Sequence, residues 1–181
     1  MNKKLPIVLL PVFLLACNLL FPAQETPSDQ QVVPTTIPEE RQEPEQMESL
    51  KLDDFTIVRL HPGDGDLQTL LEDEAQKAAS QGLMPVVEFD ATWCPPCQAI
   101  DAAIKEKNEL MMDAYRGTYI IKLDVDEWGW GVGEFEVEAI PIYFKVDSQG
   151  KPTGEVIDGG AWGEDIPENI APVMDKFFHG D

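Results

Sequence analysis

Basic residues, histidines and cysteines are scarce in this 181-residue sequence, and each scarcity excludes a class of function. The chain has 13 Lys and Arg against 34 Asp and Glu, and its formal net charge of −21 argues against nucleic-acid binding and against direct adsorption on anionic lipid. Zinc requires four ligands. Only His61, His179 and scattered carboxylates without ligand spacing are available beside the cysteines, so we predict no metal site.

The sequence also lacks an apolar run long enough to span a bilayer comfortably, although its first residues are apolar. Residues 1–17 have a basic start at Lys3 and Lys4, an apolar core and a small residue before Cys17, which is the layout of a secretory signal. Leu-Leu-Ala-Cys at this point resembles the lipobox of bacterial lipoproteins. We therefore predict a lipoprotein-type signal peptide at residues 1–16 and lipidation of Cys17; an ordinary signal peptide or an uncleaved anchor is the alternative.

The next stretch, residues 17–50, is rich in Pro, Glu and Gln and has almost no periodic apolar pattern. Such composition is typical of a disordered, partly extended linker. Packing of this stretch into a fold would need apolar residues that it mostly lacks. We expect it to hold a folded domain, residues 51–181, away from the lipid.

Strand and helix patterns alternate through this domain. We predict strands at residues 55–60, 85–90, 119–125, 142–146 and 155–158, and helices from Asp66 to about Gly82, at 96–115, at 134–139 and at 168–178. Along the 96–115 helix, Ile100, Ala103, Ile104, Leu110 and Met111 should face inward, and Pro172 should delay or kink the last helix. The alternation indicates an α/β domain with a mainly parallel sheet.

Two cysteines follow the buried strand at 85–90, in the segment Trp93-Cys94-Pro95-Pro96-Cys97 at the head of a helical pattern. Two intervening residues let the sulfur atoms approach within disulfide reach. A helix N-terminus supplies free N–H groups and positive partial charge that stabilise a thiolate. One cysteine should therefore be a nucleophile at neutral pH. An inert disulfide and half of a zinc site are the alternatives.

From about Phe55 to Phe178, the motifs and their order resemble the thioredoxin family in a membrane-anchored bacterial form. The matching features are the Trp-Cys-X-X-Cys site at 93–97, the cis-proline position at Ile140-Pro141, the buried acid at Glu88, its neighbouring lysine at Lys122, and the small pair Gly160-Ala161. The resemblance implies a thioredoxin-like α/β fold with a central mixed sheet flanked by helices. Asp90 departs from the family, which commonly has an aromatic residue there, and so does the Pro-Pro dipeptide.

This resemblance implies an extracytoplasmic thiol-disulfide oxidoreductase with no cofactor beyond the Cys94–Cys97 disulfide. Cys94, which we expect to be the more exposed cysteine, would attack a substrate disulfide, and Cys97 would resolve the mixed disulfide. Glu88 would accept the proton of Cys97, and Lys122 would tune that acid. The expected partners of this monomer are protein thiols and disulfides and a membrane electron donor, with reduction favoured over oxidation. A non-catalytic binding or chaperone lipoprotein is the rival.

The same resemblance implies a substrate groove beside the cysteines. A cis bond before Pro141 would bring the backbone of Ile140 next to the sulfur atoms, where an extended substrate could pair with it. The predicted rim residues are Trp93, Gly160 and Trp162, with Trp128 and Trp130 as further candidates. The alternatives are a trans Pro141 that merely opens a strand, and a Glu88 exposed at a strand edge.

Overall fold

The computed structural model describes residues 49–52 and 54–180, and over this part of the chain six strands form one mixed sheet in the order β1-β2-β4-β3-β5-β6. The strands are β1 (Ser49–Leu52), β2 (Phe55–Leu60), β3 (Met84–Asp90), β4 (Thr118–Asp124), β5 (Ile142–Val146) and β6 (Pro152–Asp158). The three central neighbours β2, β4 and β3 run parallel, whereas β1, β5 and β6 pair antiparallel. The predicted mixed sheet is therefore confirmed.

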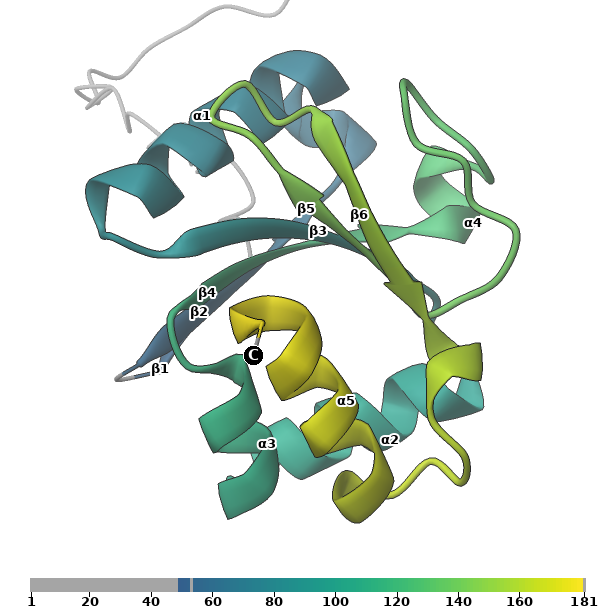
Figure 1. Ribbon diagram of the computed structural model, residues 1–181. Helices are drawn as coiled ribbons and strands as arrows, with labels where there is room; N and C mark the ends of the chain where they lie inside the picture. Colours follow the sequence, from purple (N-terminus) through teal and green to yellow (C-terminus); the bar gives the residue numbers. More distant parts are fainter. Residues whose placement is uncertain (1–48, 53, 181) are drawn as a thin grey trace, which may run out of the picture. The chain divides into compact units, whose positions relative to one another are not determined.

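Helices cover both faces of this sheet (Figure 1). They are α1 (Leu67–Ser80), α2 (Pro95–Lys105), α3 (Glu109–Tyr115), α4 (Val125–Trp128) and α5 (Pro167–His179), with single 3-10 turns at Pro62–Asp64 and Gly159–Ala161. Figure 1 shows α1 on one side of the sheet and α2, α3 and α5 on the other. Helix α1 follows the parallel strand β2, and α2 follows the parallel strand β3. The loop between β3 and α2 therefore lies at the carboxyl edge of the parallel strands.

The side chains of each strand alternate between two apolar clusters, one on each face of the sheet. On the α1 face, Val87, Phe89 and Ile121 pack with Leu71 of α1. On the opposite face, Val86 and Ile120 pack with residues of α2, α3 and α5. Glu88 and Lys122 share the second face with Val86 and Ile120, because they lie two residues further along the same strands.

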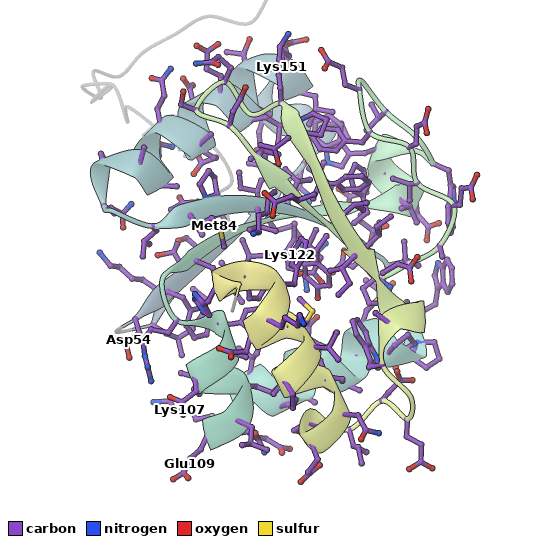
Figure 2. The ribbon with its side chains drawn as sticks, in the orientation of Figure 1. Asp54, Met84, Lys107, Glu109, Lys122 and Lys151 are labelled. Atoms are coloured by element: carbon purple, nitrogen blue, oxygen red, sulfur yellow. A yellow bond between two sulfur atoms is a disulfide. The ribbon has the colours of Figure 1, made fainter. Side chains whose placement is uncertain are left out.

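The predicted long helix at 96–115 is wrong, because the chain forms α2 and α3 with a break at 106–108. Lys107 adopts a left-handed backbone with φ 56°, and the Asn108 side chain accepts hydrogen bonds from the N–H groups of Leu110 and Met111 to cap α3. Figure 2 shows Lys107 and Glu109 on the outer side of this break. The new helix start also turns Leu110 outward, where it is 46% exposed, against the prediction that it faces inward.

Other boundaries differ less. No helix forms at 134–139; the short helix is α4, directly after β4, and Asp124 caps it through the N–H of Asp126. The last helix begins at Pro167, whose missing N–H costs nothing in the first turn. The helix continues through Pro172, so Pro172 does not delay its start. Ser49 and Leu50, at the end of the predicted linker, belong to β1.

The membrane predictions depend on residues outside the described part of the chain. The signal peptide, Cys17 and nearly all of the linker lie before Ser49. Within residues 49–52 and 54–180, every helix is too short or too polar to cross a bilayer.

Candidate active site

The Cys94-Pro95-Pro96-Cys97 segment joins β3 to α2, and Cys94 is the N-cap of that helix. The two sulfur atoms form a disulfide with an S–S distance of 2.07 Å and a Cα–Cα distance of 5.3 Å. Pro95 and Pro96 occupy the first helical positions and carry no N–H. The N–H of Cys97 donates to Cys94 Sγ at 3.3 Å, so it is the first helical N–H that can stabilise negative charge on this sulfur.

Both cysteines are buried: Cys94, predicted to be the more exposed, is 2% exposed and Cys97 is 1% exposed, so the expected difference in exposure is marginal. Both belong to the apolar cluster on the α1 face, with Phe89 and Ile142, and partly buried Ile140 packs against that cluster. The N-cap position holds Cys94 against these side chains rather than at the open end of the strand. A substrate disulfide must therefore displace covering groups to reach Cys94.

The loops opposite the cysteines are built around a cis peptide bond between Ile140 and Pro141, as predicted. The O atom of Pro141 accepts a hydrogen bond from the N–H of Gly159 at 2.9 Å. A Cβ atom on Gly159 would lie 3.2 Å from Cδ of Pro141 and 3.6 Å from Cζ2 of Trp162. Gly159 is therefore the glycine packed against Pro141, whereas the N–H of the predicted rim residue Gly160 binds Asp158 Oδ1 at 2.8 Å.

The four tryptophans differ in how far they are exposed to solvent. Trp93 is 54% exposed, and its Nε1 donates to Asp126 Oδ2 at 2.7 Å, which ties the loop before Cys94 to α4. Trp162 is buried beside Gly159 and Pro141 and donates to Asp165. Trp128 donates to the O atom of Leu60, whereas Trp130 is exposed. Of the predicted rim residues, Trp93 thus offers a surface and Trp162 supports the loop from below.

A row of four polar side chains crosses the sheet on the face covered by α2, α3 and α5. Arg59 of β2, Lys122 of β4, Glu88 of β3 and Tyr143 of β5 are register partners on consecutive strands. Adjacent register partners share a face, so these side chains meet across the sheet. Glu88 and Lys122 are both buried, which excludes the alternative of an exposed Glu88 at a strand edge. In Figure 2, Lys122 is labelled at the centre of the molecule.

The ammonium group of Lys122 reaches three carboxylates in the described part of the chain. Its Nζ lies 2.6 Å from Asp101 Oδ1, 2.9 Å from Asp90 Oδ2 and 3.3 Å from Glu88 Oε1. Arg59 holds Asp90 from the other side with two hydrogen bonds of 2.9 and 2.6 Å. Glu88 Oε1 has no hydrogen-bond partner among the described residues, so its contact with Lys122 is an ion pair without a good hydrogen bond.

These contacts shift the pKa values of Glu88 and Asp90 in opposite directions. Burial raises the pKa of Glu88 to about 7; Lys122 opposes this rise, and Asp90 and Asp101 add to it. Burial acts on Asp90 in the same direction, but Arg59 and Lys122 outweigh it and lower its pKa. Burial disfavours the charge on Lys122, and the three carboxylates overcome that penalty and raise its pKa. Glu88 is thus a buried group that can take up or release a proton near neutral pH.

Arg59, Asp90 and Asp101 were not predicted as site residues, although two of them had a sequence signal. Asp90 lies two residues after Glu88 on the same strand and so shares its face. Asp101 lies four residues after Cys97 and so shares a helix face with it. Because Asp101 contacts Lys122, this helix face connects the cysteine to the buried row. No sequence pattern marked Arg59, because its position beside Lys122 depends on β2 and β4 being neighbours in the sheet.

The known proteins similar to this chain include several thioredoxins. The family model described as Thioredoxin matches residues 68–172. A thioredoxin from Staphylococcus haemolyticus is 39% identical over 98 residues, which cover 53% of this chain and 84% of that protein. A thioredoxin from Staphylococcus aureus is 39% identical over 93 residues, 50% of this chain and 79% of that protein. The structure of thioredoxin O1 from Arabidopsis thaliana in the oxidized state is 24% identical, covers 57% of this chain and 85% of that chain, and has a TM-score of 0.38.

Proposed function

Because this chain belongs to the thioredoxin family and is a thiol-disulfide oxidoreductase, we propose that it reduces protein disulfides outside the cytoplasm through its Cys-Pro-Pro-Cys dithiol. The observation that carries the proposal is the Cys94–Cys97 disulfide at the N-terminus of α2. Cys94 is the N-cap of α2, and its sulfur accepts the N–H of Cys97, the third helical residue. The sulfur of Cys97 is held within bonding distance of the sulfur of Cys94. That geometry suits reversible exchange.

Exchange begins with the reduced dithiol. The thiolate of Cys94 attacks one sulfur of the substrate disulfide; a Cys94–substrate disulfide forms, the substrate S–S bond breaks, and one substrate thiolate leaves. Cys97 then gives its proton to Glu88 and attacks Cys94 Sγ, which closes the Cys94–Cys97 disulfide and releases the second substrate thiolate. Two electrons pass from the dithiol to the substrate, and both substrate thiolates take protons from Glu88 or water. A dithiol electron donor at the membrane returns two electrons to the cysteines.

Glu88 has the acid strength that this proton transfer requires. It is buried on the sheet face that α2 covers, and its pKa of about 7 leaves it partly ionised at neutral pH. A carboxylate of ordinary strength would be a poor acceptor for a thiol proton, since efficient general bases have a pKa near the working pH. Lys122, at 3.3 Å, limits how far burial raises the pKa of Glu88 and thereby tunes it.

The Pro-Pro dipeptide supports the reducing direction. A Gly at position 96, the second helical position, would present one more N–H to Cys94 Sγ, whereas Pro96 removes it and leaves the N–H of Cys97 as the first donor. Fewer donors stabilise the thiolate less, and a less stabilised dithiol gives up electrons more readily. A protein with this sequence should therefore favour its own oxidation and the reduction of its substrates.

We assign substrate binding to the surface around Trp93, Ile140 and Pro141. Trp93 is exposed beside Cys94 and is fixed by Asp126, so it offers a rigid apolar surface to a peptide. The backbone of Ile140 can pair with an extended substrate as an added strand. Gly159 supports this surface, because it hydrogen-bonds to Pro141 and lies close to Pro141 and Trp162; the predicted Gly160 follows it in the same turn.

Insulin reduction by dithiothreitol tests the activity, with the full-length chain compared with Cys94→Ser and Cys97→Ser. The wild type should accelerate insulin precipitation above the rate with dithiothreitol alone, and both variants should lose that acceleration. Cys97→Ser should also accumulate a mixed disulfide with insulin, because its Cys94 can attack but cannot be released. Equal rates for wild type and Cys94→Ser would exclude the enzyme.

One observation favours the rival function, a non-catalytic binding or chaperone lipoprotein whose disulfide stays closed. Both cysteines are almost fully buried, so reductants reach them poorly in this conformation. The same assay separates the two functions. A disulfide that persists in millimolar dithiothreitol, measured by thiol alkylation of the folded chain, would favour the rival.

The location outside the cytoplasm rests on the signal pattern of residues 1–16 and on Cys17. A lipidated Cys17 would tether a monomeric domain to a membrane through the linker at 17–50, and anchoring by more than one acyl chain would be stable. Expression in a bacterium tests this. The wild type should stay in the membrane fraction after a high-salt wash, and Cys17→Ala should be released from it. Equal membrane retention of both would contradict the lipid anchor.

A further inference from the structure

Resting on the proposed role of Glu88 as proton acceptor, we propose that Asp90 and Asp101 are positioning residues that hold the ammonium group of Lys122 away from Glu88. They keep the carboxylate of Glu88 incompletely neutralised and so keep it a base for Cys97. Arg59 supports this arrangement by fixing Asp90. The family resemblance implied roles for Glu88 and Lys122, and it marked Asp90 as a departure from the family; the contacts of Asp90, Asp101 and Arg59 come from the structure.

The distances around Lys122 carry the inference. An ammonium group has three N–H donors, and its two shortest contacts go to Asp101 at 2.6 Å and Asp90 at 2.9 Å. Glu88 receives the longest contact, 3.3 Å, and its Oε1 has no hydrogen bond among the described residues. A buried carboxylate oxygen without a hydrogen bond is costly, so Lys122 would move toward Glu88 if its other partners released it.

Arg59 explains why Asp90 keeps its hold on Lys122. The guanidinium group binds both oxygens of Asp90, in the two-point geometry that stabilises a carboxylate most strongly. As a result the pKa of Asp90 is lowered although the residue is buried. Asp90 therefore stays ionised over the pH range in which Glu88 titrates.

Asp101 is the member of the network that solvent can reach. Its side chain is 51% exposed and lines a cavity of about 510 Å³, together with Arg59, Lys122 and residues of β1 and α2. A residue in this position can be replaced without leaving a buried hole, because water can take the place of its carboxylate. Asp101 is thus the best position at which to test the network.

All charged and titratable groups that face Glu88 enter the expected pH dependence. They are Lys122 of β4, Arg59 of β2, Asp90 of β3, Asp101 of α2, Tyr115 of α3 and Tyr143 of β5. Burial raises the pKa of both tyrosines, so they stay protonated near neutral pH. The aspartates are therefore the groups whose charge and contacts can be altered to move the titration of Glu88.

The test measures the titration of Glu88 directly, by NMR of ¹³C-labelled glutamate carboxyl groups in the full-length oxidised chain. Glu88→Gln identifies the signal. In Asp101→Asn the midpoint should fall by roughly one pH unit, the size of shift that one nearby charge commonly produces, because Lys122 gains contact with Glu88 and a negative charge is lost. Asp101→Glu, which can still bind Lys122, should keep the wild-type midpoint. Direct repulsion between the carboxylates at positions 101 and 88 would also leave the Glu88 midpoint of Asp101→Glu equal to that of the wild type. A second comparison separates repulsion from positioning.

That comparison uses Lys122→Gln. If Asp101 acts through the position of Lys122, the shift caused by Asp101→Asn should shrink to less than half in the Lys122→Gln background; an undiminished shift would overturn the positioning role. Asp113→Asn is the matched control, because Asp113 is an exposed aspartate that pairs with Arg116 instead. An unchanged midpoint in Asp101→Asn would also overturn the inference. Because this readout needs no substrate, its failure is distinguishable from loss of insulin reduction in Cys94→Ser.

Discussion

The two faces of the central sheet are built from the same strands and have different interiors. On the α1 face, Phe89, Ile121 and Leu123 form a continuous apolar cluster with the helix. On the opposite face the apolar cluster is interrupted by a charged network around Lys122. Neighbouring residues of one strand, such as Val87 and Glu88, thus belong to different environments. The comparison suggests that the first face supplies stability and packs against the cysteines, whereas the second face supplies the buried titratable groups.

The α1 face also contains a buried acid, Glu74, and this acid shows what a purely structural charge looks like. Its two oxygens accept hydrogen bonds from Lys77 and from the hydroxyl group of Tyr119, both at 2.5 Å. Both oxygens of Glu74 are thus satisfied by hydrogen bonds, whereas Glu88 keeps one buried oxygen without a hydrogen bond among the described residues, which disfavours its ionised form.

The largest change in stability is expected from a substitution in the apolar cluster on the α1 face. Ile121→Ala removes a fully buried side chain from the α1 face and should lower the free energy of unfolding by about 4 kcal/mol. The loss should be the same at pH 5 and pH 8, because no titrating group is involved. Urea unfolding at the two pH values measures it. A loss that changed with pH would show that the two faces are coupled.

Glu88→Gln should change stability by a similar amount, but only at higher pH. The pKa of Glu88 is raised from 4.5 to about 7, so the stability that its proton contributes is fully present below 4.5 and is lost as pH rises through about 7. Gln cannot lose a proton. The variant should therefore gain about 3 kcal/mol on the wild type between about pH 4 and pH 8. Urea unfolding across this range checks it; parallel curves for both proteins would contradict the raised pKa.

Pro96→Gly tests the cysteine segment at the start of α2, because position 96 is the second helical position. The added N–H should stabilise the thiolate of Cys94 by about 1 kcal/mol and so raise the reduction potential by roughly 20 mV. Equilibration with glutathione, followed by thiol alkylation, measures the potential. Gln98→Ala, in the same helix turn but without a contact to either sulfur among the described residues, is the control. A lower reduction potential in Pro96→Gly would reverse our argument for the reducing direction.

The smallest effect is expected at the break between α2 and α3. Lys107 holds a left-handed backbone with φ 56°, which costs a residue with a Cβ atom more than it costs glycine. Lys107→Gly should therefore raise the free energy of unfolding by about 0.5 kcal/mol, after the extra entropy of glycine in the unfolded chain is subtracted. Thermal unfolding measures it, with Lys105→Gly in the regular part of α2 expected to destabilise instead.

Most elements of this fold could be predicted from the sequence, because apolar periodicity and capping residues indicated them directly. Asp66 accepts the N–H of Thr69 at the start of α1, as expected of an N-cap. The break after α2 was missed because Ile104 and Met111 continue a helical apolar pattern across it. Only the backbone of Lys107 and the cap at Asn108 reveal the interruption, and neither Lys nor Asn is a strong breaker.

The candidate site could be predicted in part. Cys94, Cys97 and Pro141 lie in recognisable motifs, and the buried position of Glu88 followed from the family pattern. The roles of these residues stay predictions until the assays above are done. The contacts of Asp90, Asp101 and Arg59 could not be foreseen, because they depend on which strands are neighbours and on which side of α2 faces the sheet.

The position of β1 has a mechanical consequence. This four-residue strand is the part of the described domain that comes first after the linker, and it is held by an antiparallel ladder from Ser49↔Val58 to Leu52↔Phe55. If the chain is anchored at Cys17, tension on the tether acts on Ser49 first, and an antiparallel ladder pulled from its open end separates one pair at a time. Such force would peel β1 from the sheet and widen the cavity beside Asp101, since Ser49 and Leu50 of β1 form part of its wall.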